Sequence, residues 1–150
     1  MKKIAFVCTA NSCRSQMAEG FARLLGRGAV EVWSAGLIKA GVNERAAAVM
    51  REAGVDISGQ WSKTLDEIPV REMDLVVTLC DNADMYCPNV GSKKVHKPVK
   101  DPVAAVGPEK DVMNDFRRAR DEIKMIVSDL LAELAAAPDP QARMRKPAIH

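Results

Sequence analysis

The order of the first 25 residues constrains the fold more than any other feature of the sequence. Residues 4–8 form a continuous apolar run, which is typical of a strand buried on both faces. A polar stretch over residues 9–15 follows, and Met17 and Phe21 then stand at helical spacing within residues 16–25. A strand that passes through a short polar turn into a helix favours an α/β fold with a parallel sheet.

The alternation of strand and helix patterns continues along the rest of the chain. Further strands are predicted over residues 30–34, 74–79 and 93–96, and further helices over residues 45–52 and 110–136. We therefore expect a single α/β domain over residues 1–137, built on an open parallel four-stranded sheet with helices on both faces. Residues 138–150 show no periodicity and are predicted to form a mobile tail.

Composition excludes several classes of function. A formal net charge of +2 is too small to indicate nucleic acid as a partner. No apolar run approaches the ~20 residues needed to cross a membrane, and the amino-terminal run is too short for a secretion signal. We expect a cytoplasmic monomer, in which four cysteines are more often reactive or metal-binding than joined in permanent disulfides.

Residues 8–15 have the pattern of an oxyanion-binding loop that carries its own nucleophile. A loop that leads into a helix offers unpaired backbone N–H groups and the positive end of the helix dipole to an anion. Arg14, six positions after Cys8, is placed to hold two oxyanion oxygens with its guanidinium group. The same positive surroundings favour the thiolate of Cys8, to which Ser15 can donate a hydrogen bond. The predicted oxyanion cradle consists of Thr9, Ala10, Asn11, Ser12, Cys13, Arg14 and Ser15.

The resemblance to a known family rests on this loop and on two later segments. Residues 8–20 and the sequence Ser-Ala-Gly at 34–36 resemble the low-molecular-weight tyrosine phosphatase superfamily. Within it, residues 11–20 and 76–80 resemble the thioredoxin-coupled arsenate reductases, and the likeness covers about residues 3–134. The resemblance implies the phosphatase-like fold and a cysteine nucleophile. Both branches share the loop, so the loop does not decide between phosphatase and reductase.

A second pair of cysteines separates the two branches. Reduction of arsenate requires two electrons, which further thiols must supply, whereas a phosphatase needs a nucleophile, an oxyanion clamp and a general acid. Cys80 and Cys87 have six residues between them, which matches the redox pair of the arsenate reductases. The segment between them is polar and Pro88 follows it, as suits a loop that must rearrange. The alternative is a zinc site, but zinc ligands favour gaps of two to four residues.

The resemblance implies a relay of three thiols. Cys8 attacks arsenate, Asp101 protonates the leaving oxygen, and Cys80 then attacks Cys8 to release arsenite. Cys87 attacks Cys80 in turn, and thioredoxin reduces the resulting disulfide. After Asp101 the chain reads Pro-Val-Ala-Ala, without the aromatic residues that help phosphatases of this family to hold phosphotyrosine. The predicted catalytic residues are Cys8, Arg14, Cys80, Cys87 and Asp101.

Lys63 argues against a potassium ion beside the loop. Some family members hold this ion with residues that match Asn11, Glu19 and Ser34, together with an acidic residue at the position that is Lys63 here. An ammonium group cannot ligate a cation and repels it, so Lys63 is expected to take the place of the ion beside Glu19. We predict no metal requirement and no cofactor.

Two other functions are kept as alternatives. One is a low-molecular-weight phosphatase that acts on phosphoesters, an activity that a reductase of this kind would also retain weakly. The other is a thiol-based oxyanion sensor, in which Cys80 and Cys87 report oxidation without turnover. A nucleophile, an oxyanion clamp and an acid in one chain favour an enzyme over a sensor.

Overall fold

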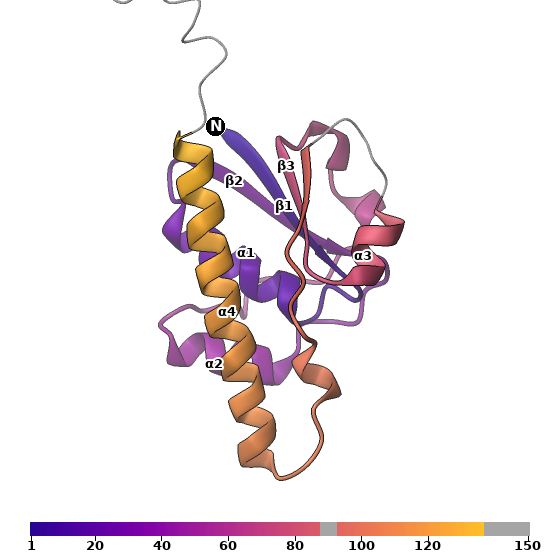
Figure 1. Cartoon of the computed structure of the whole chain (residues 1–150), viewed down its shortest axis with the longest axis vertical. Coiled ribbons are helices and arrows are strands. Elements are labelled where there is room, and N and C mark those ends of the chain that lie inside the picture. Colours follow the sequence, from indigo (N-terminus) through magenta and orange to yellow (C-terminus); the bar gives the residue numbers. More distant parts are fainter. Residues whose placement is uncertain (88–92, 137–150) are drawn as a thin grey trace, which may run out of the picture.

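Four strands form one parallel sheet in the computed structural model, which describes residues 1–87 and 93–136 (Figure 1). The spatial order of the strands is β2-β1-β3-β4. Their bounds are Lys2–Cys8 for β1, Val30–Gly36 for β2, Leu75–Thr78 for β3 and Lys93–His96 for β4. The predicted α/β fold with an open parallel four-stranded sheet is confirmed. The predicted mobile tail and the domain end at residue 137 lie outside the described residues.

Three of the helices pack together, and a fourth stands apart from them (Figure 1). The group consists of α1 (Arg14–Leu25), α2 (Glu44–Glu52) and α4 (Glu109–Ala136). The short helix α3 (Asp81–Tyr86) lies against β1 and β3 instead. Three-residue 3-10 helices occur at Leu65–Glu67, Val70–Glu72 and Pro102–Ala104. Asn43 caps α2, because its side chain accepts hydrogen bonds from two backbone N–H groups of the first turn.

The core is centred on β1, whose residues 4–7 are completely buried. Successive side chains of a strand point to opposite faces of the sheet, so both faces of β1 are covered. Phe21 on α1 and Phe116 on α4 are each 1% exposed, and these two helices pack against each other. Burial of each such side chain contributes roughly 1.5–3 kcal/mol. Among the described residues, no helix is long and apolar enough to span a membrane.

The sheet brings Cys8 and Cys80 to the same edge. Cys8 ends β1, and Val7 stands opposite Thr78 in the neighbouring strand β3. The backbone N–H of Leu79 still donates to the carbonyl of Val7 at 2.9 Å, so the pairing runs to the residue before Cys80. The carboxyl ends of parallel strands form the edge at which α/β proteins bind ligands.

The sequence-based prediction of a loop between Cys80 and Cys87 is wrong, because this segment forms α3. The sulfur of Cys80 accepts the backbone N–H of Ala83 and so caps the first turn. Ala83 is fully buried. Asp81 and Asp84 place negative charge in the first turn, where the helix dipole is positive, and so stabilise the helix. A six-residue helix carries too little apolar periodicity to be recognised from its composition.

Candidate active site

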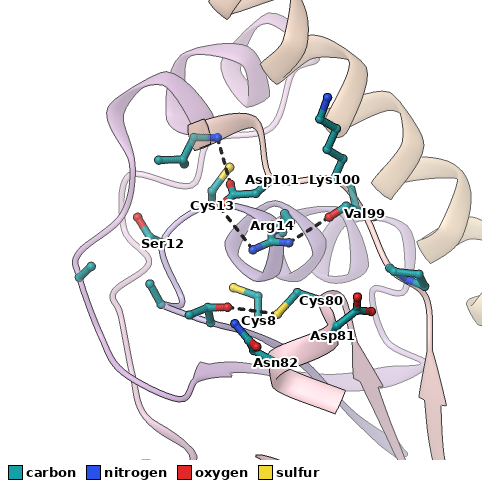
Figure 2. A pocket seen from close by; sticks show the side chains of 15 residues that line it. Cys8, Ser12, Cys13, Arg14, Cys80, Asp81, Asn82, Val99, Lys100 and Asp101 are labelled. Carbon is teal, nitrogen blue, oxygen red and sulfur yellow. Dashed lines mark hydrogen bonds and ion pairs between the residues drawn. The ribbon is translucent and has the colours of Figure 1, made fainter. Parts of the chain in front are cut away.

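A cavity of about 760 Å³ opens at the carboxyl edge of the sheet (Figure 2). Most of its wall comes from three segments, namely the loop between β1 and α1, the start of α3 and the stretch that leads into the last 3-10 helix, and Ala40 adds to it from the segment after β2. In Figure 2 the Cys8 and Cys80 side chains point into the cavity from one side, and the Arg14 guanidinium group lies opposite them. The cavity thus brings together four residues predicted to be catalytic, which are Cys8, Arg14, Cys80 and Asp101.

The Cys8 sulfur has a hydroxyl partner that can hold it as a thiolate. Its Sγ atom lies 2.8 Å from the Oγ atom of Ser15, in the first turn of α1. The Nδ2 group of Asn11 donates to the same Ser15 oxygen at 2.8 Å. Since Asn11 occupies an acceptor position of that oxygen, the hydroxyl proton of Ser15 is available to Cys8. Cys8 is therefore placed to act as a nucleophile toward an anion in the loop.

Asn11 fixes the shape of the loop from its centre. Its backbone has a φ of 47°, in the left-handed region that asparagine tolerates better than most residues. Its Nδ2 group also donates to Ser34, and its Oδ1 atom accepts from Gln16 and from the backbone N–H of Lys63. Asn11 is fully buried, and these bonds reach residues from three other parts of the chain. Hydrogen bonds within the protein therefore set the shape of the loop.

Gly36 allows the loop to lie directly against the end of β2. A Cβ atom at Gly36 would lie 2.4 Å from the carbonyl oxygen of Ile38 and 2.6 Å from the backbone nitrogen of Asn11. Both of these atoms belong to the backbone, so neither can turn aside as a flexible side chain would. Only glycine fits at this position without displacing the anion loop.

Arg14 is held toward the segment that carries Asp101. Its Nη1 group donates to the carbonyl of Val99 at 2.9 Å, and its Nη2 atom lies 3.6 Å from Oδ2 of Asp101. Arg14 is 8% exposed, whereas the Asp101 side chain is 42% exposed. Asp101 also accepts the backbone N–H of Val103, so it combines the turn-forming role of an Asp-Pro pair with a position on the cavity wall.

Cys80 contacts the anion loop directly. Its Sγ atom lies 3.2 Å from the Oγ1 atom of Thr9. Cys87 follows the last residue of α3 and is 5% exposed, and burial raises the pKa of its thiol. All four cysteines are reduced in this structure. Cys80 and Cys87 thus lie at opposite ends of one short helix. Of these two cysteines, Cys80 lines the cavity and Cys87 does not.

Cys13 differs from the other three cysteines in its surroundings. It precedes α1 and is 4% exposed. Burial raises the pKa of its thiol far above the ordinary range, and the charges of Cys8 and Asp101 act in the same direction. A buried thiol in apolar surroundings is less reactive than an exposed one. Burial thus favours Cys13 as a small packed residue of the loop over a reactive group.

Lys63 occupies the place beside Glu19 that the sequence assigns to it. Its Nζ atom lies 3.6 Å from Oε1 of Glu19 and donates to the carbonyl of Trp61 at 2.7 Å. Ser34 donates to the same Glu19 oxygen at 2.6 Å. Lys63 and Glu19 are 8% and 2% exposed, so this is a buried ion pair. Within residues 1–87 and 93–136, no group of three or more His, Cys, Asp or Glu side chains is placed to hold a metal ion.

Two residues that support the site are absent from the sequence-based prediction. Gln16 is fully buried and donates from Nε2 to the carbonyl of Asn11, and Ser62 donates to the same carbonyl from a position 51 residues away. The helical pattern of α1 gives no sign that Gln16 is buried, because glutamine is usually exposed on a helix. The contact of Ser62 depends on tertiary structure, so no local pattern indicates it.

Comparisons with known proteins agree with this geometry. The family described as low molecular weight phosphotyrosine protein phosphatase matches residues 3–139. An arsenate reductase of Halalkalibacterium halodurans is 47% identical over 81% of this chain and 89% of its own length. One of Staphylococcus aureus is 42% identical over 85% of this chain and 95% of its own. A solved arsenate reductase in the reduced state superposes with a TM-score of 0.76 at 37% identity, over 89% of this chain and 99% of that one.

Proposed function

The chain belongs to the low molecular weight phosphotyrosine protein phosphatase family, and we propose that it uses the anion site of this family to reduce arsenate to arsenite. The observation that carries the proposal is the position of Cys80, whose sulfur contacts Thr9 of the anion loop at 3.2 Å. A hydrolase has no use for a second thiol at this point. A reductase needs one to take arsenic from the +5 to the +3 state.

The first step is capture of arsenate in the loop. The anion accepts hydrogen bonds from backbone N–H groups at the start of α1 and from Arg14, which turns from Val99 toward the anion. The thiolate of Cys8 attacks arsenic, a sulfur–arsenic bond forms and one oxygen leaves. Asp101, 3.6 Å from Arg14, protonates that oxygen so that it departs as water.

The second step transfers two electrons to arsenic. The thiolate of Cys80 attacks the sulfur of Cys8, and the sulfur–arsenic bond breaks with its electron pair remaining on arsenic. Arsenite leaves, and a Cys8–Cys80 disulfide has formed. Cys87 then attacks the sulfur of Cys80, so the Cys8 thiolate is regenerated and the disulfide moves to Cys80–Cys87.

Reduction of the Cys80–Cys87 disulfide closes the cycle, and we assign this step to thioredoxin. The dithiol of thioredoxin is oxidised as the Cys80–Cys87 pair is reduced, which balances the two electrons given to arsenic. The five residues of the proposed machinery lie within one α/β domain, and we propose that the protein works as a monomer. A dithiol reductant of this kind operates in the cytoplasm, where thiols are kept reduced.

A weak phosphatase activity is the second candidate, supported by the shared oxyanion loop and acid. A phosphoester fits the same loop, and Cys8, Arg14 and Asp101 suffice for its hydrolysis. The lining of the cavity contains no aromatic residue among the described part of the chain, so phosphotyrosine would find no ring to stack on. Hydrolysis of small phosphoesters is therefore a side activity.

The proposal is tested by coupled turnover with arsenate, thioredoxin, its reductase and a nicotinamide reductant. Wild type consumes the nicotinamide only when arsenate is present, and Cys8→Ser, Cys80→Ser and Cys87→Ser each abolish this consumption. The Cys87→Ser variant accumulates a Cys8–Cys80 disulfide that mass spectrometry detects. Turnover that survives loss of Cys80 and Cys87 would refute the relay. Phosphoester hydrolysis, in contrast, persists in these two variants and is lost with Cys8.

A further inference from the structure

The helix between the two redox cysteines is too short to be stable by itself. Isolated helices of fewer than about 12 residues are marginal in water, and α3 has six. Its stability must come from contacts with the rest of the protein. Besides the buried Ala83 and the cap by Cys80, these contacts include a set of side-chain hydrogen bonds and ion pairs. We call the residues that make them the α3 clamp: Thr78, Asp81, Asp84, Lys94 and His96.

His96 is the centre of the clamp, because it connects β3 to the start of α3. Its Nδ1 atom lies 2.9 Å from Oγ1 of Thr78, and its Nε2 atom lies 2.9 Å from Oδ1 of Asp81. Thr78 in turn donates its hydroxyl proton to Asp84 at 3.0 Å. The Asp81 carboxylate accepts from Nε2, so His96 links β4 to the first residue of α3.

Lys94 completes the clamp from the same strand as His96. Its Nζ group donates to the backbone carbonyl of Asp84 at 2.5 Å and lies 3.5 Å from the Oδ1 atom of that residue. The hydrogen bond from Thr78 lowers the pKa of Asp84, and the charge of Lys94 acts in the same direction. Two residues of β4 thus hold α3: His96 contacts Asp81, and Lys94 contacts Asp84.

This arrangement excludes a disulfide between the two ends of α3. Cys80 and Cys87 are the residues that cap the helix, seven positions apart. With a rise of 1.5 Å per residue, their Cα atoms are about 10 Å apart along the helix. A disulfide requires a Cα separation of about 4.4–6.8 Å. Cys87 can therefore reach Cys80 only when α3 unwinds and releases the clamp.

We propose that His96 is a positioning residue that holds Cys80 at the anion loop for the first disulfide and must release α3 for the second. The bond between Cys8 and Cys80 forms with the clamp closed. The clamp then opens, Cys87 attacks the Cys80 sulfur, the Cys8–Cys80 bond breaks and Cys8 leaves as a thiolate. The inference rests on the proposed function, because it assumes that the Cys80–Cys87 disulfide forms.

The reduction potential of the Cys80–Cys87 pair tests this role without any need for arsenate. The protein is equilibrated in mixtures of reduced and oxidised dithiothreitol, and the fraction of disulfide is measured by mass spectrometry. Because the clamp stabilises the dithiol form, His96→Ala favours oxidation by about twofold, the size expected for a contact to the exposed Asp81 side chain. That corresponds to a potential about 9 mV more negative for a two-electron couple. Lys93→Ala, on the same strand but exposed, leaves the potential unchanged.

A double-mutant cycle assigns the effect to the contact with Asp81. Asp81→Ala shifts the potential in the same direction, and the variant with both changes shifts it no further than the larger single change. Melting temperatures of the reduced proteins show whether each variant is folded. An additive double variant, or a His96→Ala potential equal to that of wild type in a folded protein, would overturn the proposal.

Single-turnover kinetics separate the two halves of the relay. In a Cys87→Ser background, His96→Ala slows formation of the Cys8–Cys80 disulfide after arsenate is added. With Cys87 present, it speeds transfer from Cys8–Cys80 to Cys80–Cys87. Equal slowing of both steps would contradict a clamp that has to open. If wild type forms no Cys80–Cys87 disulfide at all, the proposed function fails, and this outcome is distinct from a disulfide whose potential His96 does not affect.

Discussion

The Oγ atom of Ser15 lies 2.8 Å from the sulfur of Cys8, and it receives its own hydrogen bond from Asn11. This relationship ties the nucleophile at the end of β1 to the first turn of α1. It also directs the Ser15 proton to the sulfur, where it stabilises the thiolate rather than the thiol.

Replacement of Ser15 by alanine therefore slows chemistry without unfolding the loop. Loss of a hydrogen bond to a charged group corresponds to roughly a tenfold to hundredfold fall in turnover. Coupled arsenate turnover and the rate of Cys8 alkylation by iodoacetamide at neutral pH both measure this change. Ser128→Ala, an exposed position on α4, is the matched control. Unchanged alkylation in Ser15→Ala would mean that the hydroxyl does not support the thiolate.

Lys63→Ala tests the buried ion pair with Glu19. Removal of the ammonium group leaves Glu19 buried with less compensation, so we expect a loss of about 3 kcal/mol in the free energy of unfolding. Lys39→Ala removes the exposed pair with Glu67 and costs less than about 1 kcal/mol. Urea unfolding of the three proteins measures both values. Equal costs would show that burial of the Lys63–Glu19 pair has no energetic weight.

The same lysine predicts that arsenate turnover does not depend on potassium. Lys63 supplies the positive charge beside Glu19 that a cation would otherwise provide. Turnover measured at equal ionic strength in sodium and potassium chloride is expected to be the same. Strong activation by potassium would contradict the assignment of Lys63 to this place.

Gly36→Ala tests how closely the anion loop depends on the end of β2. The added methyl group displaces backbone of residues 10–11 and 38, so arsenate KM rises and the free energy of unfolding falls by about 1–3 kcal/mol. Gly59→Ala meets no atom within 4 Å and changes stability by less than about 0.5 kcal/mol. Steady-state kinetics and urea unfolding report the two effects, and a Gly36→Ala protein with unaltered KM would argue against this contact.

Glu52 predicts an acid-dependent part of the stability. The pKa of Glu52 is lowered from 4.5 to about 2, chiefly by its hydrogen bond with Arg117. A hydrogen bond with Arg120 acts in the same direction. The contribution is therefore complete above about pH 5 and is lost as the pH falls from there toward 2. Urea unfolding of wild type and Glu52→Gln at pH 6, 4 and 2.5 should show a difference that shrinks with acid. A difference that stays constant over this range would contradict the assignment.

The sequence predicts the strands and the loop that carry the site, because short local patterns determine these elements. The apolar run before Cys8 and the run before Cys80 each indicate a buried strand, and parallel strands bring their ends together. The spacing of Cys8 and Arg14 then indicates the cradle, and the pair Cys80 and Cys87 indicates the redox step.

The remaining parts of the site depend on contacts between distant residues. The sequence predicts Gln16 as an exposed helix residue, yet it is fully buried and donates hydrogen bonds to Asn11 and Trp61. His96 is one of several basic residues near position 95, and the sequence does not distinguish it from a solvated face. Its role depends on Asp81, 15 residues earlier, and on a helix that the sequence does not indicate. Tertiary contacts decide these positions, and composition does not encode them.

The first and last thiols of the relay, Cys8 and Cys87, are held by different kinds of structure. Cys8 is the last residue of β1 and pairs with Gly36 of β2, whereas Cys87 follows the short helix α3, which we propose must unwind during the relay. Mutations can therefore alter the affinity for the reductant without altering the affinity for the oxyanion. Directed evolution on residues 83–86 and 93–96, which lie outside the cavity wall, should move such a protein from one electron donor to another while its specificity for the acceptor is inherited unchanged.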